Sequence, residues 1–178
     1  FRLPVCSADG QTTYSIVGFG ASLLKQKTTI KEVYLPDGLQ TIGNECFKGC
    51  SALWKIEPFL PSTLTAVPPL NSWGTAVTND LKLCGPQMTK VGDSYFMFIN
   101  NIMSVDMTGS SIETFDGAAF NACYSLTNVT FANVPLHFST SKDIFANTTK
   151  VKSFRFRGEP PTFAGTDPFA SGSTMFSF

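Results

Sequence analysis

The sequence predicts a single α/β solenoid dominated by short parallel strands, which form one curved sheet with turns and short helical segments on the other side. A motif of about 24 residues recurs with constant internal steps, and such self-similarity is the signature of a repeat architecture. Each copy carries a short alternating strand followed by turn-forming residues. The 43% hydrophobic content and the 17 phenylalanines indicate a packed core rather than a disordered chain.

The repeat is defined by an apolar residue, a phenylalanine five residues later, and further small or aliphatic residues at steps of three. Residues 42–56 and 115–129 follow this pattern with cysteine three residues after the phenylalanine. Residues 91–105 follow it with isoleucine at that position. Decayed copies begin at Phe145 and Phe169. Several copies with the same steps predict that equivalent side chains stack from one coil to the next.

The phenylalanines of the repeat should form the center of this stack. Phe96, Phe120, Phe145 and Phe169 lie 24, 25 and 24 residues apart, and Phe47 precedes Phe96 by two periods with Trp73 near the middle. Phe19 is expected to head an earlier, looser copy. Burying one such ring is worth roughly 1.5–3 kcal/mol, so the stack should dominate the stability of the fold.

One short strand is predicted in each copy, at residues 33–35, 105–107, 129–131 and 154–156. Alternation places the first and third residues inward and the middle residue outward. Turn-forming residues follow at 36–38, 109–111 and 158–161. The stretch after each phenylalanine is long enough for about one helical turn.

We expect one domain over residues 1–178, with about six to seven repeats that are irregular at 1–29 and 58–80. The second irregular region contains Pro58, Pro61, Pro68 and Pro69, which would also break a membrane-spanning helix. The last residue falls where another strand should begin, so the chain is expected to be a fragment of a longer protein.

Residues 30–53 closely resemble the BspA-like class of leucine-rich repeat, whose unit is similar to L-x-x-I-x-I-P-x-x-V-x-x-I-G-x-x-A-F-x-x-C-x-x-L. The resemblance is strongest there and over 88–129, and it weakens toward the C-terminus. It implies a leucine-rich-repeat solenoid within a larger secreted or cell-surface protein linked to adhesion and partner recognition. The family offers no catalytic motif, so the resemblance implies a non-enzymatic protein without a cofactor.

The charge pattern gives no indication of a nucleic-acid or membrane partner. Thirteen basic and thirteen acidic residues cancel, and no basic stripe of the kind that nucleic acids or anionic membranes attract is present. The five cysteines are a poor disulfide framework, and Cys46 with Cys50 lacks the second pair that a zinc site needs. Cys50 and Cys123 are instead expected to be small buried side chains of the coil wall.

No constellation of side chains indicates catalysis. His137 is the single histidine and is expected at the surface, since no nucleophile motif accompanies it. Asp106 and Glu113 do not form a convincing carboxylate pair because a turn separates them. Asn128 and Asn147 head matches to the N-glycosylation sequon, which chance would also produce in a chain rich in threonine.

The outward strand positions remain as the candidate site. We expect them to line the concave sheet, mixed in charge at one end and basic at the other, and to bind a protein partner that is host-extracellular in origin. The alternatives are a structural spacer and a carbohydrate-binding accessory region. The residues of this face are Glu32, Tyr34, Lys55, Glu57, Lys82, Asp106, Asn128, Thr130, Ser153, Arg155 and Arg157.

Overall fold

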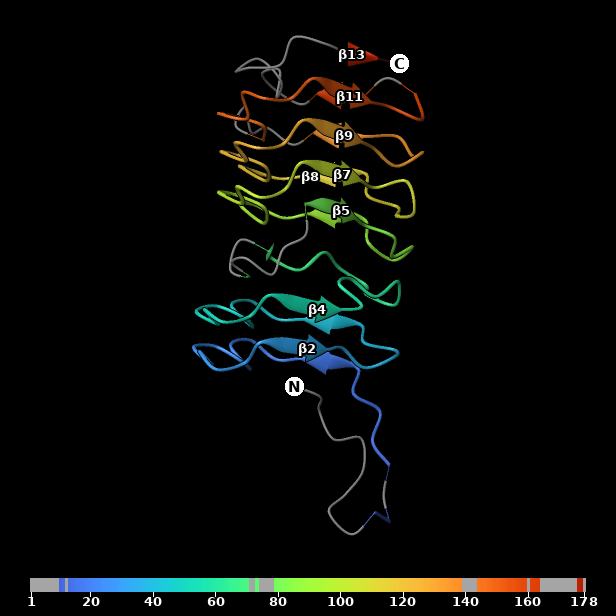
Figure 1. Cartoon of the computed structure of the whole chain (residues 1–178). Coiled ribbons are helices and arrows are strands. Elements are labelled where there is room, and N and C mark those ends of the chain that lie inside the picture. Colours follow the sequence, from blue (N-terminus) through green and yellow to red (C-terminus); the bar gives the residue numbers. More distant parts are fainter. Residues whose placement is uncertain are drawn as a thin grey trace.

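The computed structural model confirms the solenoid, a stack of about five coils built from short parallel strands (Figure 1). It describes residues 10–11, 13–70, 73, 79–138, 144–159, 161–163 and 176–177. Cys6, one of the five cysteines, and the decayed copy that begins at Phe169 lie outside these residues. Within them, no helix is both long enough and apolar enough to cross a membrane.

The predicted strands form the face of the stack that is turned toward the viewer in Figure 1. We call this face the long-strand face. All its pairings are parallel, and they make a two-stranded sheet (β2–β4) and a five-stranded sheet (β5–β7–β9–β11–β13). Its strands are β2 (Glu32–Tyr34), β4 (Lys55–Glu57), β5 (Asp80–Lys82), β7 (Ser104–Asp106), β9 (Asn128–Thr130), β11 (Ser153–Arg155) and β13 (Phe176–Ser177).

Each predicted strand begins one residue earlier than expected, but its alternation is as predicted. Val33 and Leu35 are buried on either side of the half-exposed Tyr34. The earlier start brings Glu32, already expected on this face, into the strand before the buried Val33. Each coil therefore presents two outward strand side chains on this face.

A second parallel sheet was not predicted and corrects the expectation of a single sheet. Its strands are only two residues long, so they show no alternation that a sequence pattern could reveal. Adjacent coils pair here as well, in a two-stranded sheet (β1–β3) and a four-stranded sheet (β6–β8–β10–β12). The strands are β1 (Gly18–Phe19), β3 (Thr41–Ile42), β6 (Lys90–Val91), β8 (Thr114–Phe115), β10 (His137–Phe138) and β12 (Thr162–Phe163).

A third set of hydrogen bonds joins the turns that carry the phenylalanines, and we call it the turn ladder. Every second backbone N–H of one turn donates to the next coil, as in Leu24 to Cys46 (3.0 Å) and Phe98 to Asn121 (3.1 Å). The segments expected to hold a helical turn are these hydrogen-bonded turns. The residue two places after each stacked side chain has a left-handed φ of 56° to 75°, at Gln26, Gly49, Phe98, Ala122 and Asn147.

The stacked aromatic core is confirmed. Phe120 lies between Phe96 and Phe145, with ring centroids 4.7 and 5.2 Å away and the rings nearly parallel. Trp73 occupies the predicted middle position and meets Phe47 edge-on at 4.8 Å. Such pairs stabilise by about 0.5–1.5 kcal/mol beyond the burial of their area.

The first copy of the repeat is headed by Leu24 and not by Phe19. The N–H of Leu24 bonds to the residue before Phe47, as the N–H of Phe96 bonds to the residue before Phe120. Phe19 lies in β1 and pairs with Ile42 of the next coil. Both side chains are buried, so hydrophobicity alone could not separate the two positions.

The position three residues after each stacked side chain makes one recurring hydrogen bond. The thiols of Cys50 and Cys123 and the hydroxyl of Thr148 each donate, over 2.9 Å, to the carbonyl of the stacked residue in the preceding coil. Cys46, Cys50 and Cys123 are buried and free, and burial raises the pKa of the Cys123 thiol to about 12. These are the structural thiols predicted from the sequence.

The proline-rich coil interrupts both sheets. On the long-strand face a proline contributes to the break, because proline has no N–H to donate. In other coils the residue after the long strand donates to the next strand, as Leu35 does to Glu57 (2.8 Å) and Leu83 to Asp106 (2.8 Å). Pro58 holds that position after β4, and β4 does not pair with β5. The predicted irregularity therefore divides the stack into two blocks (Figure 1).

Candidate binding face

The outward side chains of the long-strand face form two rows that run from coil to coil. In the first row Glu32 is opposite Lys55, and beyond the interruption come Asp80, Ser104, Asn128 and Ser153. In the second row Tyr34 is opposite Glu57, and beyond the interruption come Lys82, Asp106, Thr130 and Arg155. All the predicted strand residues of the face thus lie in these rows, and Arg157 follows β11 by two residues.

Two residues of the first row, Asp80 and Ser104, were missed in the sequence analysis. Ser104 is the first residue of a strand that begins one residue earlier than expected, and Asp80 is the first residue of a strand whose bounds were not predicted. The Ser104 hydroxyl donates to Asp80 Oδ1 (2.6 Å), and farther along the row the Ser153 hydroxyl donates to Asn128 Oδ1 (2.9 Å). A polar residue directly before each buried strand center would have been the signal.

The N-terminal end of the face satisfies its own charges. The Tyr34 hydroxyl donates to Glu32 Oε2 (2.6 Å), and Lys55 Nζ lies 2.6 Å from Glu57 Oε2 and 5.3 Å from the Tyr34 ring centroid. The hydrogen bond with Glu32 raises the pKa of Tyr34, and the hydrogen bond with Glu57 raises the pKa of Lys55. The charged groups of this end are therefore engaged with neighbouring side chains of the face.

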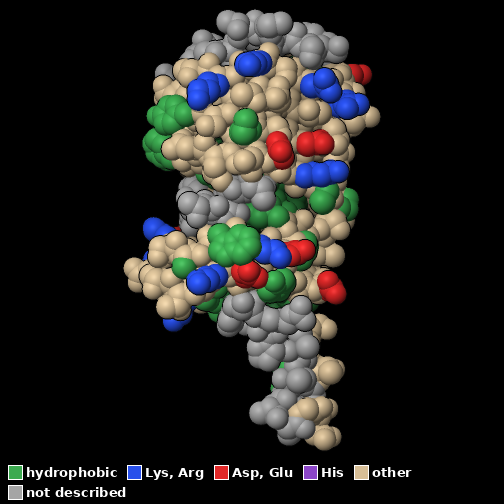
Figure 2. Space-filling model, viewed as in Figure 1, with side chains coloured by type: hydrophobic (Ala, Val, Ile, Leu, Met, Phe, Trp, Pro, Cys, Tyr) green, Lys and Arg blue, Asp and Glu red, His purple; other side chains and the backbone are tan. Residues whose placement is uncertain are grey.

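The C-terminal end of the face is different because its cations are exposed. Arg155 and Arg157 are exposed, and neither makes an ion pair within the described part of the chain. In Figure 2 Lys and Arg side chains are spread over the upper coils, where β9 and β11 lie. Arginine, with tryptophan and tyrosine, is enriched among the residues that contribute most to binding a protein partner.

Asp106 is an acidic residue of the second row whose charge interacts with the charges of Lys82 and Arg157. Burial raises its pKa, but the Thr108 N–H (2.9 Å from Oδ1), the Thr108 side chain and the charges of Lys82 and Arg157 outweigh burial, so the pKa is lowered overall. The carboxylate is therefore ionised at neutral pH. Its bond to Thr108 also fixes the start of the turn after β7.

A hollow of about 370 Å³ lies beyond the ends of three successive strands of this face. Thr108, Asn133 and Arg157 line it, one from the turn after each of β7, β9 and β11. All three side chains are exposed and polar. The hollow was not predicted, because Thr108 and Asn133 lie in turns whose path the strand pattern does not fix.

The remaining candidates are not brought together into a reactive site. His137 is exposed in β10 and its Nδ1 lies 2.8 Å from the Thr162 hydroxyl, as expected for a surface histidine. Asp106 belongs to the long-strand face, whereas Glu113 directly precedes β8 of the other sheet. Among the described residues no three His, Cys, Asp or Glu side chains are grouped to hold a metal ion.

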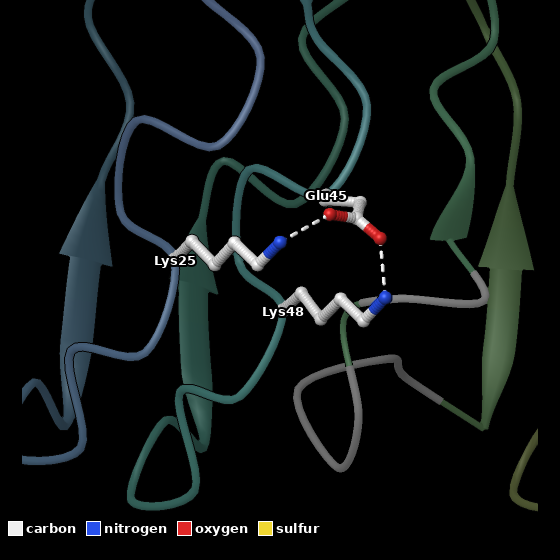
Figure 3. A network of polar contacts seen from close by, with 3 residues as sticks. All are labelled: Lys25, Glu45 and Lys48. Atoms are coloured by element: carbon white, nitrogen blue, oxygen red, sulfur yellow. Dashed lines mark hydrogen bonds and ion pairs between the residues drawn. The ribbon is translucent and has the colours of Figure 1, made fainter.

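A separate charge cluster lies on the turn ladder, away from the strand rows (Figure 3). Glu45 bonds to Lys48 of its own turn and to Lys25 of the preceding coil, the latter over 2.6 Å. Hydrogen bonds with Lys25 and then with Lys48 lower the pKa of Glu45 to about 2. This cluster joins two coils, and its three charged groups are engaged with one another.

The fold defines a leucine-rich-repeat solenoid. Residues 17–70 and 75–173 match the family of BspA type leucine rich repeat regions with six copies, so the chain belongs to that family. Such repeat regions are typically non-catalytic, and proteins that carry them are commonly found at cell surfaces. A comparison with curated proteins finds no match.

Two solved structures resemble the chain. One is a leucine-rich repeat protein of T. pallidum, TpLRR, with 19% identity and a TM-score of 0.68 over 91% of this chain and 71% of that one. The other is a leucine-rich repeat protein from Bacteroides ovatus, with 12% identity and a TM-score of 0.35 over 88% of this chain and 63% of that one. At these identities the first likeness establishes the fold alone.

Proposed function

We propose that the chain is a non-enzymatic recognition module of a secreted or cell-surface protein and that it binds a protein partner through the long-strand face. The observation that carries this proposal is the uneven distribution of free charge on that face. Glu32, Tyr34, Lys55 and Glu57 are engaged with one another, whereas Arg155 and Arg157 are exposed without an ion pair in the described residues.

The rigidity of the face supports the same proposal. Its side chains stand on strands that are paired on both sides from β7 to β11 and are backed by the stacked phenylalanines. Ser104 and Ser153 are further held by hydrogen bonds within their row. Polar groups that are already ordered lose less conformational entropy on binding, which favours affinity.

A carbohydrate ligand is the second candidate, favoured by exposed aromatic rings outside the strand rows. Trp54 directly precedes β4 and is 60% exposed, and Tyr124 is 46% exposed. Rings of this kind could stack against sugars, but no second ring is placed beside either in a described aromatic pair. The protein-binding proposal is therefore preferred, because it rests on several residues of the long-strand face and the carbohydrate candidate rests on single rings.

The test is affinity capture from extracellular matrix and mucus with two charge-matched variants. Arg155→Glu/Arg157→Glu reverses the basic end of the long-strand face, and Lys27→Glu/Lys150→Glu makes the same change in net charge at two exposed lysines elsewhere. Both variants must keep the thermal unfolding midpoint of the parent chain. We expect one or more proteins to be retained by the parent and the control but lost with the arginine variant.

Equal retention by all three chains would move the site off the basic end of the face. No retention of any protein by the parent chain would contradict the recognition proposal and favour a structural spacer. Retention of glycans alone, abolished by Trp54→Ala or Tyr124→Ala, would favour the carbohydrate candidate.

A further inference from the structure

We propose that the hollow beyond β7, β9 and β11 receives a side-chain carboxylate of an extended acidic peptide segment that lies across the C-terminal end of the long-strand face. This inference rests on the proposed function and names the chemistry of its partner. The hollow is formed by Thr108, Asn133 and Arg157, which come from three successive coils.

The lining residues supply hydrogen-bond donors of complementary kinds. Arg157 offers a planar guanidinium that can bind both oxygens of a carboxylate, Thr108 a hydroxyl and Asn133 an amide. Among the described residues, none of the side chains that line the hollow is acidic. Its volume of about 370 Å³ admits an acidic side chain together with part of its own backbone and is too small for a folded element.

The hollow is held open by contacts of the turns that form it. Asp106 Oδ1 accepts the N–H of Thr108 (2.9 Å), which fixes the first turn. At the third turn a Cβ on Gly158 would make ordinary van der Waals contact with Asn133 Oδ1 and with the Val134 carbonyl, both at 3.4 Å, so the last two turns lie side by side. Asp106 is therefore a positioning residue that does not contact the carboxylate.

The charge around the hollow favours an isolated carboxylate. Arg155 lies two residues before Arg157 and is likewise exposed and without an ion pair in the described residues. Acidic side chains accompany these cations, since Asp106 is close enough to Arg157 for their charges to interact and Glu159 is exposed two residues farther on.

A peptide fits this pattern better than a sulfated polysaccharide. A polymer with a negative charge on every unit would pay for repulsion from Asp106 and Glu159, whereas a peptide can place its acidic and neutral side chains selectively. Arg155 and Arg157 are two residues apart in the same coil, and side chains on one face of an extended peptide repeat about every 6.6–6.8 Å. One carboxylate in the hollow and a second near Arg155 are therefore compatible with an extended backbone.

The test measures binding of a fluorescein-labelled octapeptide of alternating serine and glutamate by fluorescence anisotropy. Its control replaces every glutamate with glutamine. We expect the acidic peptide to bind at least tenfold more tightly than the neutral one, because a hydrogen bond to a charged group is worth about that factor or more. Arg157→Gln should weaken the acidic peptide by about tenfold, and Thr108→Val by a smaller factor.

The matched control variant is Lys27→Gln, which removes one positive charge from the turn ladder and should leave the affinity unchanged. Because Arg157 and Lys27 are both exposed, neither change should shift the thermal unfolding midpoint. Equal affinity of Arg157→Gln and the parent chain for the acidic peptide would overturn the proposal. So would the absence of any difference between the acidic and the neutral peptide.

A heparin-derived hexasaccharide is the third probe. If it binds more tightly than the acidic peptide and its binding is lost with Arg157→Gln, the hollow belongs to a polysaccharide and the peptide proposal fails. The proposed function is judged separately by the capture experiment. Capture of a protein through Arg155 and Arg157, with no binding of the acidic peptide, would reject this inference and leave protein recognition in place.

Discussion

The two blocks of coils on either side of the proline-rich coil use the same repeat but differ in how completely it is connected. In the N-terminal block both sheets are two-stranded, and the charged side chains of Glu32, Glu45, Lys55 and Glu57 are engaged in local pairs. In the C-terminal block the sheets have five and four strands, and the core is a stack of parallel rings.

This comparison teaches that the unpaired arginines of the long-strand face lie where its strand ladder is continuous. The C-terminal block is held by backbone pairing and aromatic stacking, so Arg155 and Arg157 are not needed to join coils. Away from this face, ion pairs join neighbouring coils in both blocks, Lys25 with Glu45 in the first and Lys90 with Asp116 in the second. A binding surface is therefore expected where the interior already provides the stability.

The largest expected effect is on the aromatic core. Phe120→Ala should lower the free energy of unfolding by about 3–5 kcal/mol, since the site cannot collapse around the lost ring. Phe47→Ala should cost less, because Phe47 meets Trp73 edge-on and has Leu24, not a ring, at the equivalent place in the preceding coil. Urea unfolding of both variants measures the difference, and equal losses would contradict the contrast between the blocks.

The buried hydroxyl of Thr148 is the next target. Thr148→Val keeps the shape but leaves the Phe120 carbonyl without this donor, so the free energy of unfolding should fall by about 1–3 kcal/mol. Thr149→Val is the control, because Thr149 is exposed and its change should stay within about 0.5 kcal/mol. If the two variants unfold at the same urea concentration, the coil-to-coil bond contributes nothing.

An exchange of residues between the blocks tests the turn ladder. Phe98 has a φ of 63° and is 60% exposed, whereas Gly49 holds the equivalent position with a φ of 75°. A left-handed φ costs a non-glycine residue about 1–2 kcal/mol, and glycine loses about 0.5–1 kcal/mol more in chain entropy. Phe98→Gly should therefore raise the free energy of unfolding by about 0.5–1 kcal/mol.

The reciprocal variant Gly49→Ala should destabilise by a similar amount. Its Cβ would meet Gln26 Cγ at 3.3 Å, so a neighbouring side chain must also shift. Thermal unfolding at equal protein concentration measures both variants. A loss of stability in Phe98→Gly would show that the exposed ring packs in solution and that the strain argument is wrong.

The smallest expected effect is on pH dependence in the N-terminal block. The pKa of Glu45 is lowered from 4.5 to about 2, so its contribution to stability is present above pH 4.5 and is lost as the pH falls toward 2. In Glu45→Gln the decline of the unfolding midpoint between pH 4.5 and 2 should be shallower than in the parent chain. Asp93→Asn is the control, since Asp93 lies in the other block. An identical pH profile of Glu45→Gln and the parent chain would show that the contacts of Glu45 do not contribute to the pH dependence of stability.

Much of the fold could be predicted because the core residues recur at a fixed period in the sequence. The stacked phenylalanines and Trp73 recur at fixed spacing, as does the buried residue three positions after each phenylalanine. The structure places them as expected. The second sheet could not be predicted, since two-residue strands such as Lys90–Val91 leave no alternating pattern. Leu24 was missed because it replaces an aromatic residue with a smaller apolar one.

The candidate face was predictable in outline only. Apolar strand centers such as Val129 fix which neighbours point outward, so the rows follow from the sequence. Which of the outward charges are already paired does not follow, because Lys55 could have reached several acids in adjacent coils. The hollow depends on turn geometry at Thr108, Asn133 and Arg157, which lie about 25 residues apart and meet only through stacking.

The missing N–H of Pro58 has a mechanical consequence. Hydrogen bonds between coils run along the axis of the stack, so tension applied to its ends loads these bonds one coil interface at a time. The interface between β4 and β5 lacks the donor that Leu35 and Leu83 supply elsewhere, and we expect it to part first. Each further coil would then release about 24 residues, or roughly 80 Å of extended chain, so a pulled molecule would lengthen in steps instead of rupturing at once.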